Sequence, residues 1–535
     1  MRYRTCLLVL WGVWLFVPLA HAQHENQPYG EVDFPTSCQA EAQAPFETGL
    51  ALLHHMMYEQ AAGHFATAAE ADPTCAMAHW GLAMTQLHPL WAPPTEQEFD
   101  RGRAAVEQAK TLEAPTERER QYIEAIVAYY TTAEESDHRA GVRAWEAAQK
   151  ALHEAFPEDV DAAAFYALSH LATAPPDDDT FAHQRRAGAL LEDLLDEAPA
   201  HPGLFHYLIH AYDNPALAEK ALDVARGYDK LAPDVPHALH MPSHIFVRLG
   251  IWPDVIAWNL RSAEAALRQS PAEYTSLHHV HALDYLVYAY LQRGQDQKAQ
   301  EILRKILEID NYQPHPASAY GIAAAQARYA LERRQWDEAA ELPLRVHDAY
   351  PWNDFPEHEA ITYWARGLGA ARTGDLDAAR TAVDTLDVLH ERTLEKGEDY
   401  WATLVDARST TLSAWIAYAE GDHDRALNLM REAADLEDSV DKHPITPSEV
   451  LPARELLGDM LLALDHPAQA IDAYRAALEI SPNRFNSLYG AGQAAERTGQ
   501  HDVAKAFYAK LAEISEEANS ERESLIQAKN FLAEH

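Results

Sequence analysis

One spacing of small, aromatic and proline residues occurs near both ends of this 535-residue chain. Its members are Gly49, Ala61, Phe65 and Pro73 in the first copy, and Gly458, Ala470, Tyr474 and Pro482 in the second. Small residues let two helices approach closely, an aromatic side chain fills the space between them, and proline ends the second helix. A repeated spacing of this kind predicts pairs of antiparallel helices stacked along the chain.

Weaker copies of the same phrase occur between the two ends, with turn glycines at Gly250, Gly294, Gly374 and Gly421. Apolar residues recur every three or four positions, and β-branched runs are rare. The pattern resembles the tetratricopeptide repeat, a hairpin of about 34 residues. This resemblance implies an all-α, right-handed superhelical solenoid over residues 43–535, regular at about 43–76 and 451–515 and degenerate and histidine-rich at about 200–310. The motifs HYLIHAYD and HALHMPSHIF further resemble a group of exported bacterial repeat proteins.

The N-terminus is typical of a secretory signal. Residues 1–22 combine two arginines, an apolar run and a small-x-small cleavage site, so we expect an exported protein, periplasmic or secreted, with a linker at 23–42. Only Cys38 and Cys75 remain after cleavage, and an oxidising compartment favours a disulfide between them. No later stretch is long and apolar enough for a transmembrane segment.

The charge balance narrows the range of partners. The chain contains 43 Lys and Arg against 83 Asp and Glu, a net charge of −40. Such a chain repels nucleic acid and anionic membranes, so we expect neither as a partner. The acids are spread along the whole chain, which is typical of a solvated surface.

Histidines concentrate where the resemblance places a ligand groove. In tetratricopeptide repeats the first helix of each hairpin lines the concave groove, chiefly through its second, fifth and ninth positions. Those positions here are Gly203, His206, His210, His237, His240, His244, His281, Asp284 and Tyr288. Six of the nine are histidine, although histidine accounts for only 29 of the 535 residues.

Packed together without a counter-charge, protonated imidazoles would repel one another and lose protons readily. A bound metal ion or anion would relieve this repulsion. A transition metal, an anionic ligand and plain packing all remain open, and the metal is the leading hypothesis. Neutral imidazoles suit Zn, Cu or Fe. The candidate metal ligands are His206, His210, His237, His240, His244 and His281, with Asp213 and Asp284 either as ligands or as acceptors that orient the imidazoles. By contrast, we interpret His54-His55-Met56-Met57 as packing.

Three further residues are candidates for contacting a ligand in the groove, namely Tyr288, Arg454 and Glu455. The sequence contains no H-E-x-x-H, G-x-S-x-G or P-loop motif, so any catalysis would depend on the histidines. The first hypothesis is therefore a solenoid that binds a peptide, protein or small molecule in its concave groove, with a metal at the histidines. The alternatives are a metal-dependent hydrolase or oxidase, and a protein adaptor of the cell envelope.

Overall fold

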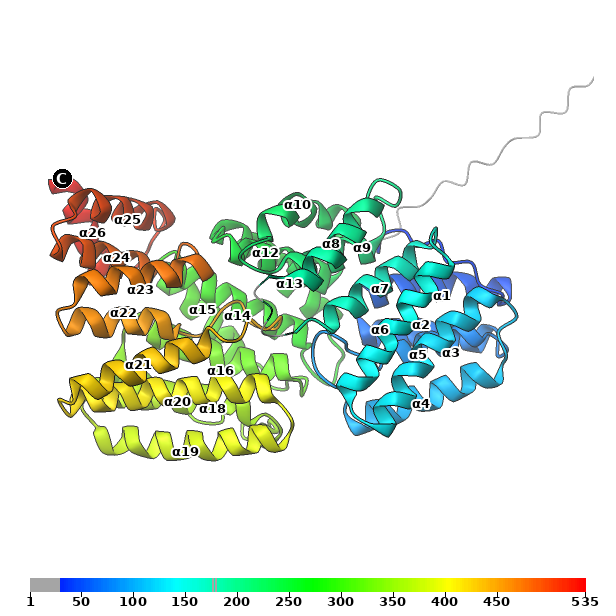
Figure 1. The fold of residues 1–535 in the computed structure, drawn as a ribbon, viewed down its shortest axis with the longest axis horizontal. Helices are drawn as coiled ribbons and strands as arrows, with labels where there is room; N and C mark the ends of the chain where they lie inside the picture. The colour runs from blue at the N-terminus through cyan, green and yellow to red at the C-terminus, as the bar shows by residue number, and fades with distance from the viewer. Residues whose placement is uncertain (1–28, 176–177, 179) are drawn as a thin grey trace, which may run out of the picture.

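The computed structural model describes residues 29–535 except 176–177 and 179, and it is an all-α solenoid (Figure 1). Its first helices are α1 (Ala40–His54), α2 (Tyr58–Ala71), α3 (Ala76–Met84), α4 (Glu96–Thr111), α5 (Glu117–Glu135), α6 (His138–Ala155), α7 (Val160–Ala172), α8 (Ala182–Leu194), α9 (Pro202–Tyr212), the 3-10 helix η1 (Ala218–Ala221), α10 (Leu222–Leu231), α11 (Pro236–His240), α12 (Pro242–Arg248) and α13 (Trp252–Gln269). They occupy the blue to green part of the ribbon (Figure 1).

The remaining helices continue the stack to the opposite end of the molecule, where the C-terminus lies (Figure 1). They are α14 (Leu277–Gln292), α15 (Asp296–Leu307), α16 (Pro316–Leu331), α17 (Trp336–Ala340), the 3-10 helix η2 (Trp352–Asp354), α18 (Pro356–Thr373), α19 (Leu376–Glu395), α20 (Asp399–Ala419), α21 (His423–Glu437), α22 (Ala453–Ala463), α23 (Pro467–Ile480), α24 (Phe485–Arg497), α25 (His501–Ile514) and α26 (Glu523–Glu534). An isolated strand-like bridge joins Thr275 and Tyr312.

Each hairpin pairs two consecutive helices, and the first helices of neighbouring hairpins also touch one another. In the middle of the chain the stacked first helices are α9, the α11–α12 pair, α14 and α16. This arrangement brings residues from separate repeats onto one continuous layer.

The glycines and aromatics of the repeat pack as the sequence predicts. Tyr474 on α23 lies between Gly458 on α22 and Gly490 on α24, where an added Cβ would come within 2.6 and 2.2 Å of its ring. Phe65 on α2 occupies the same place between Gly49 and Gly81. Only glycine therefore permits these helix contacts, which confirms the repeat prediction at both ends of the chain.

The predicted disulfide is present. Cys38 and Cys75 are bonded, with their Cα atoms 4.9 Å apart, and the bond closes the open end of the α1–α2 hairpin. Residues 29–39, which the sequence assigns to a linker, pack onto this hairpin, because Phe34 is fully buried against Phe46 and Trp80. The predicted signal at 1–22 lies outside the described residues.

A non-helical segment, residues 439–452, crosses the first helices of the middle repeats. Its Thr446 and Ser448 carbonyls accept hydrogen bonds from the Tyr285 and Tyr320 hydroxyls, at 2.9 and 3.2 Å. Most of residues 445–452 are buried. The chain itself therefore fills part of the groove in which the sequence predicts a ligand.

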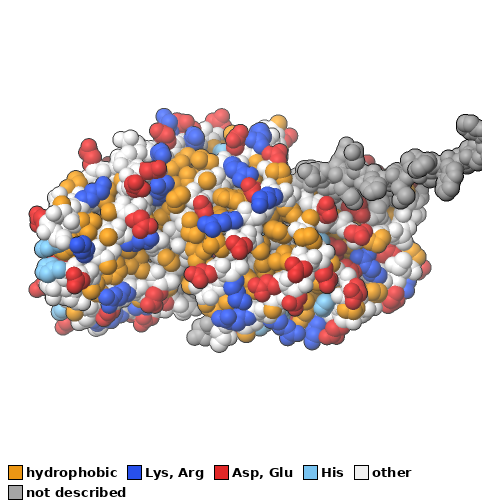
Figure 2. Space-filling model, turned by 90° about the horizontal axis from the view of Figure 1, so that it is seen from above, with side chains coloured by type: hydrophobic (Ala, Val, Ile, Leu, Met, Phe, Trp, Pro, Cys, Tyr) orange, Lys and Arg blue, Asp and Glu red, His pale blue; other side chains and the backbone are white. Residues whose placement is uncertain are grey.

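The surface carries charges of both signs over the whole face seen in Figure 2, with acidic side chains interspersed among basic and apolar ones. This distribution agrees with the spread of acids along the sequence. Among the described residues, none of the helices combines the length and apolarity required to cross a bilayer.

Candidate metal centre

Three neighbouring first helices bring all six predicted histidines together. The contributors are His206 and His210 from α9, His237 and His240 from α11, His244 from α12 and His281 from α14. Five of them are at most 6% exposed, and His210 is half-buried. The sequence places these side chains on an open groove wall, whereas the structure buries them beneath the layers that pack on the first helices.

Proline interrupts the helix that carries the central histidines. The sequence suggests one continuous helix through His237, His240 and His244, but α11 ends at His240 and α12 begins at Pro242. Proline has no N–H to continue the hydrogen-bond ladder, so the helix breaks there. The break leaves His240 and His244 facing one another, with their Nε2 atoms 3.1 Å apart.

The six histidines separate into two groups of three. In the His240 triplet (His240, His244 and His281) and the His206 triplet (His206, His210 and His237), the nitrogens within each group lie within 4.8 Å of one another. Such clustering of neutral nitrogen donors matches the donor set of a transition-metal site. The sequence placed all six on one wall but did not separate them into two groups.

The tautomer of His240 follows from its neighbour on α13. The Asn259 amide nitrogen donates to the Ser243 hydroxyl and the Val255 carbonyl, at 2.6 and 2.8 Å, so its oxygen is free to accept. His240 Nδ1 lies 2.8 Å from that oxygen and must donate to it. His240 therefore carries its proton on Nδ1 and a lone pair on Nε2.

Asp213 fixes His244 in the same way. The carboxylate accepts from His244 Nδ1 at 2.8 Å and also pairs with Arg248 and Lys442, at 2.9 and 2.8 Å. Burial by itself would raise the pKa of Asp213, but the two cations outweigh it and hold that pKa well below its ordinary value. Asp213 is thus an ionised acceptor that orients an imidazole, one of the two roles predicted for it, and His244 Nε2 also carries a lone pair.

Two lone pairs consequently face each other across 3.1 Å. A hydrogen bond between His240 and His244 would require one ring to carry two protons. Burial, followed by the proximity of His244, lowers the pKa of His240 well below its ordinary value, and burial also lowers the pKa of His244. Both rings are therefore neutral near pH 7, and no proton lies between the two facing nitrogens.

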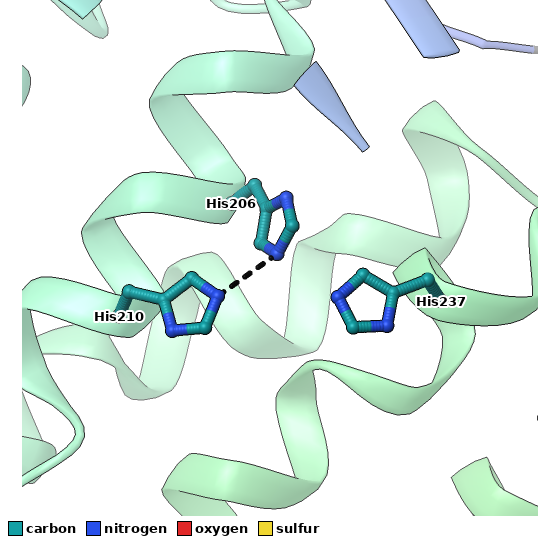
Figure 3. Close-up of side chains that lie close together, drawn as sticks. All are labelled: His206, His210 and His237. Atoms are coloured by element: carbon teal, nitrogen blue, oxygen red, sulfur yellow. Dashed lines mark hydrogen bonds between the residues drawn. The ribbon is translucent and has the colours of Figure 1, made fainter. Parts of the chain in front are cut away.

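The His206 triplet differs in one respect, because no hydrogen bond in the described chain fixes the tautomer of His210 (Figure 3). His206 Nδ1 donates to the His54 backbone carbonyl at 2.6 Å, so its Nε2 carries a lone pair, which accepts a hydrogen bond from His210 Nε2 at 3.2 Å. His237 points toward both rings from the neighbouring helix. Both ring nitrogens of His237 are buried without a hydrogen-bond partner among the described residues.

Asp284 lies apart from the metal ligands predicted beside it. It is fully buried on α14 and pairs with Arg328 of α16. Burial raises its pKa, an effect that Arg328 opposes. Asp284 therefore joins two helices, and its hydrogen bonds in the described chain do not involve the six histidines.

The three residues predicted to contact a ligand are engaged elsewhere. Tyr288 is fully buried and accepts a hydrogen bond from Arg484 at 3.1 Å. Glu455 is also fully buried, paired with Arg484 at 3.0 Å, while Arg454 pairs with the acids of α21 and the turn after it. Tyr288 and Glu455 are therefore not on an open groove, whereas Arg454 lines a cavity of about 580 Å³.

A third group was not predicted as a site. His54, interpreted from sequence as packing, lies with Asp161 and His201, and all three are buried. The Asp161 carboxylate accepts from Nε2 of both histidines, at 2.8 and 3.2 Å. These nitrogens are occupied by protons, so the group is an internal hydrogen-bond network that joins α1, α7 and the start of α9. Nothing in the local sequence signals it, since its members are 40 to 147 residues apart.

A cavity of about 580 Å³ lies beside the His240 triplet. It is bounded by Arg248 and Lys442, which hold Asp213, and by parts of the 439–452 segment. Glu437, Asp438 and Arg454 line it farther out. The cavity therefore combines charges of both signs and is linked to His244 through Arg248 or Lys442 and then Asp213.

The comparisons agree with the repeat architecture. Residues 451–484 and 485–517 match the tetratricopeptide repeat family model, so the chain contains tetratricopeptide repeats at its C-terminal end. No curated protein matches the sequence.

Solved structures that resemble the chain include a tetratricopeptide repeat protein from Parabacteroides merdae ATCC 43184, which is 16% identical over 56% of this chain and 98% of that chain, with a TM-score of 0.30. Two monomeric IFIT1 mutants, one with m7Gppp-AAAA and one with Gppp-AAAA, are 11% and 12% identical over 89% of this chain and 96% of theirs, with TM-scores of 0.37. Overall similarity at this level supports no conclusion about function.

Proposed function

We propose that this protein is a metal-binding tetratricopeptide solenoid in which the His240 triplet holds one transition-metal ion. One observation carries the proposal. His240 and His244 are each fixed, by Asn259 and Asp213, in the tautomer that directs an Nε2 lone pair at the other. Hydrogen bonds that orient ligating imidazoles in this way accompany metal-binding histidines.

His281 supplies the third donor, since its ring centroid lies 4.2 Å from that of His240. Three imidazoles without a thiolate suit Zn²⁺, Cu²⁺ or Fe²⁺. With the metal bound, the site would supply a Lewis acid, and Asp213 would hold His244 in its ligating orientation.

The sharpest test compares neighbouring histidines on α14. His281 makes no hydrogen bond within the described chain, whereas His279 donates to the Ala263 carbonyl at 2.7 Å and faces away from the triplet. We expect wild type and His279→Gln, purified without a histidine tag, to contain the same near-stoichiometric Zn, Cu or Fe by elemental analysis. His281→Gln and the double variant His240→Ala/His244→Ala should lose it. Wild-type protein that holds no metal after reloading with each ion would overturn the proposal.

The three-histidine donor set of the His240 triplet supports a second candidate, metal-dependent catalysis. Three protein ligands leave a coordination position for water or substrate, as catalytic sites require. An activity that disappears in His281→Gln but survives in His279→Gln would favour an enzyme. A protein captured equally by wild type and both variants would favour the adaptor hypothesis.

We also propose that the protein is exported. The Cys38–Cys75 disulfide supports this location, because disulfides persist in oxidising compartments. Cell fractionation with an antibody to the chain should find it in the periplasm or medium, shortened by about 22 residues at its N-terminus. Full-length protein in the cytosol would contradict export.

A further inference from the structure

The His206 triplet is separate from the His240 triplet, and its geometry points to another ion. We propose that His206, His210 and His237 bind a second transition-metal ion, so that the chain holds two neighbouring metal sites with three histidines each. The inference rests on the proposed function, because it assigns the same donor chemistry to the adjacent group. Its observations, however, come from different residues.

The first observation is the orientation of His206. Its Nδ1 proton is committed to the His54 carbonyl, so Nε2 carries the lone pair that faces His210 Nε2 at 3.2 Å, and a metal would replace the proton between these two nitrogens. His54 is itself held in place by Asp161 and by the Tyr207 hydroxyl, at 2.8 and 3.0 Å. The hydrogen bonds of His54 with Asp161 and Tyr207 thus hold in place the residue whose backbone carbonyl orients His206.

The second observation is the unpaired ring of His237. It is 4% exposed, and neither nitrogen has a hydrogen-bond partner in the described chain. Its ring instead contacts Trp91, whose centroid lies 5.3 Å away, and the imidazoles of His206 and His278. Burying an unpaired polar ring is unfavourable, and a structural role would be met better by an apolar side chain. His358 is buried without partners too, but His237 also has the nitrogens of His206 and His210 within 4.8 Å, so a metal bonded to one nitrogen would account for this histidine.

The third observation is the contact between the two triplets. The His210 and His244 ring centroids are 5.9 Å apart, and those of His237 and His240 are 6.1 Å apart. Each triplet nevertheless keeps its own three converging nitrogens. Two ions bound there would be near neighbours.

The charges around the two triplets restrict which further ligands two bound metal ions could have. Among the described residues, Asp213 is the only carboxylate hydrogen-bonded to any of the six histidines, and Arg248 and Lys442 already balance its charge. Two divalent ions would therefore need water-derived or other small anions to complete their coordination. The net charge of −40 on the chain favours cations over the molecule as a whole.

The experiment measures how many Cu²⁺ ions the chain binds and whether the ions are close. Metal-free protein is loaded with Cu²⁺, dialysed, and examined by elemental analysis and electron paramagnetic resonance. We expect two ions per chain in wild type, with spectra broadened by the interaction of two nearby spins. In His237→Phe we expect one ion per chain and the narrow spectrum of an isolated site.

His358→Phe is the matched control. His358 is also fully buried with both ring nitrogens unpartnered, but it is not part of either triplet. It should retain two ions and the broadened spectrum. Because neither substitution removes a hydrogen bond, both variants should fold, and the temperature of unfolding checks this.

The outcomes separate the two proposals. One ion in wild type, lost in His281→Gln and kept in His237→Phe, would overturn the second site and leave the proposed function intact. No bound ion would overturn both. Two ions in His237→Phe, or a loss in His358→Phe, would also overturn the second site, since the additional ion would not depend on the His206 triplet.

Discussion

The C-terminal repeats and the histidine-rich middle are built from the same hairpin but satisfy their buried polar groups differently. In the C-terminal repeats, the fully buried Arg484 pairs with Glu332 at 2.7 Å and Glu455 at 3.0 Å. Asn486 and Ser487 beside it are hydrogen-bonded to the same acids. Every charge in this network has a partner, and the glycine and tyrosine contacts fill the space around it.

The middle repeats leave polar atoms without partners. His240 and His244 oppose two lone pairs, and His237 has no hydrogen bond among the described residues. Other buried polar atoms, among them both ring nitrogens of His358, also lack a partner in the described chain, but in each triplet three imidazole nitrogens converge within 4.8 Å. Residues retained against stability are candidates for function.

The largest effect should come from Tyr474, the aromatic side chain that packs between the helices of the regular C-terminal repeats. Tyr474→Ala empties the space between Gly458 and Gly490, and we expect the free energy of unfolding to fall by roughly 3–5 kcal/mol because of the cavity. Urea unfolding followed by circular dichroism measures it. Tyr474→Phe removes only the hydrogen bond to Asp459, at 2.7 Å, and should lose about 1 kcal/mol. Equal losses in both variants would show that packing is not what stabilises these repeats.

The paired charges give the next largest effect. Glu455→Gln leaves Arg484 and Arg334 without a full counter-charge in a buried site, so unfolding should become easier by about 3 kcal/mol. Glu513→Gln is the matched control, since its partner Lys510 is at 3.0 Å on the surface and such pairs contribute under about 1 kcal/mol. If the two variants lost the same stability, the buried network would not distinguish the C-terminal repeats from the middle.

The fold is predictable from the sequence because residues close together in the chain define the repeat. The separations of Gly458, Ala470 and Tyr474 determine which helices touch, and no distant contact is needed to read them. The same register placed the six histidines on first helices, which the structure confirms. The site-level predictions were less complete, because partners such as Arg328 for Asp284 lie on another repeat.

Two further features required the three-dimensional structure. The division into triplets depends on how α9, α11, α12 and α14 rotate against one another, and Pro242 alters that rotation in the middle of the motif. The burial of the site depends on residues 439–452, which contact Tyr285 from more than 150 residues away. A histidine-rich face can be recognised from sequence, but what covers it cannot.

A smaller effect of opposite sign should appear in the middle repeats. In metal-free protein, His237→Phe removes two unpartnered buried nitrogens, so we expect the free energy of unfolding to rise by roughly 1–3 kcal/mol. His240→Phe breaks the hydrogen bond to Asn259 and should lower it by a similar amount. Urea unfolding in the presence of a chelator measures both. A loss of stability in both variants would mean that His237 is a structural residue like its neighbour.

A pH-dependent effect concerns His55, a buried histidine whose hydrogen bonds are complete. His55 Nε2 donates to the Tyr29 carbonyl at 3.0 Å, and Nδ1 accepts from the Tyr228 hydroxyl at 2.9 Å. Burial lowers the pKa of His55 to about 3. Because the unfolded pKa is about 6.5, the unfolded chain takes up this proton first as the pH falls. The stability that neutral His55 contributes is therefore present above about pH 6.5 and is lost progressively toward pH 3.

Replacing His55 should flatten that pH dependence. In His55→Gln we expect the free energy of unfolding to change less steeply between about pH 6 and 4, by about 1.4 kcal/mol for each pH unit, the equivalent of one proton. Urea midpoints at several pH values, with a chelator present, give the slope. Tyr228→Phe keeps the buried imidazole and should keep the wild-type slope while losing stability at every pH. An unchanged slope in His55→Gln would mean that His55 takes up its proton in the folded state over the same pH range as in the unfolded chain, contrary to its lowered pKa.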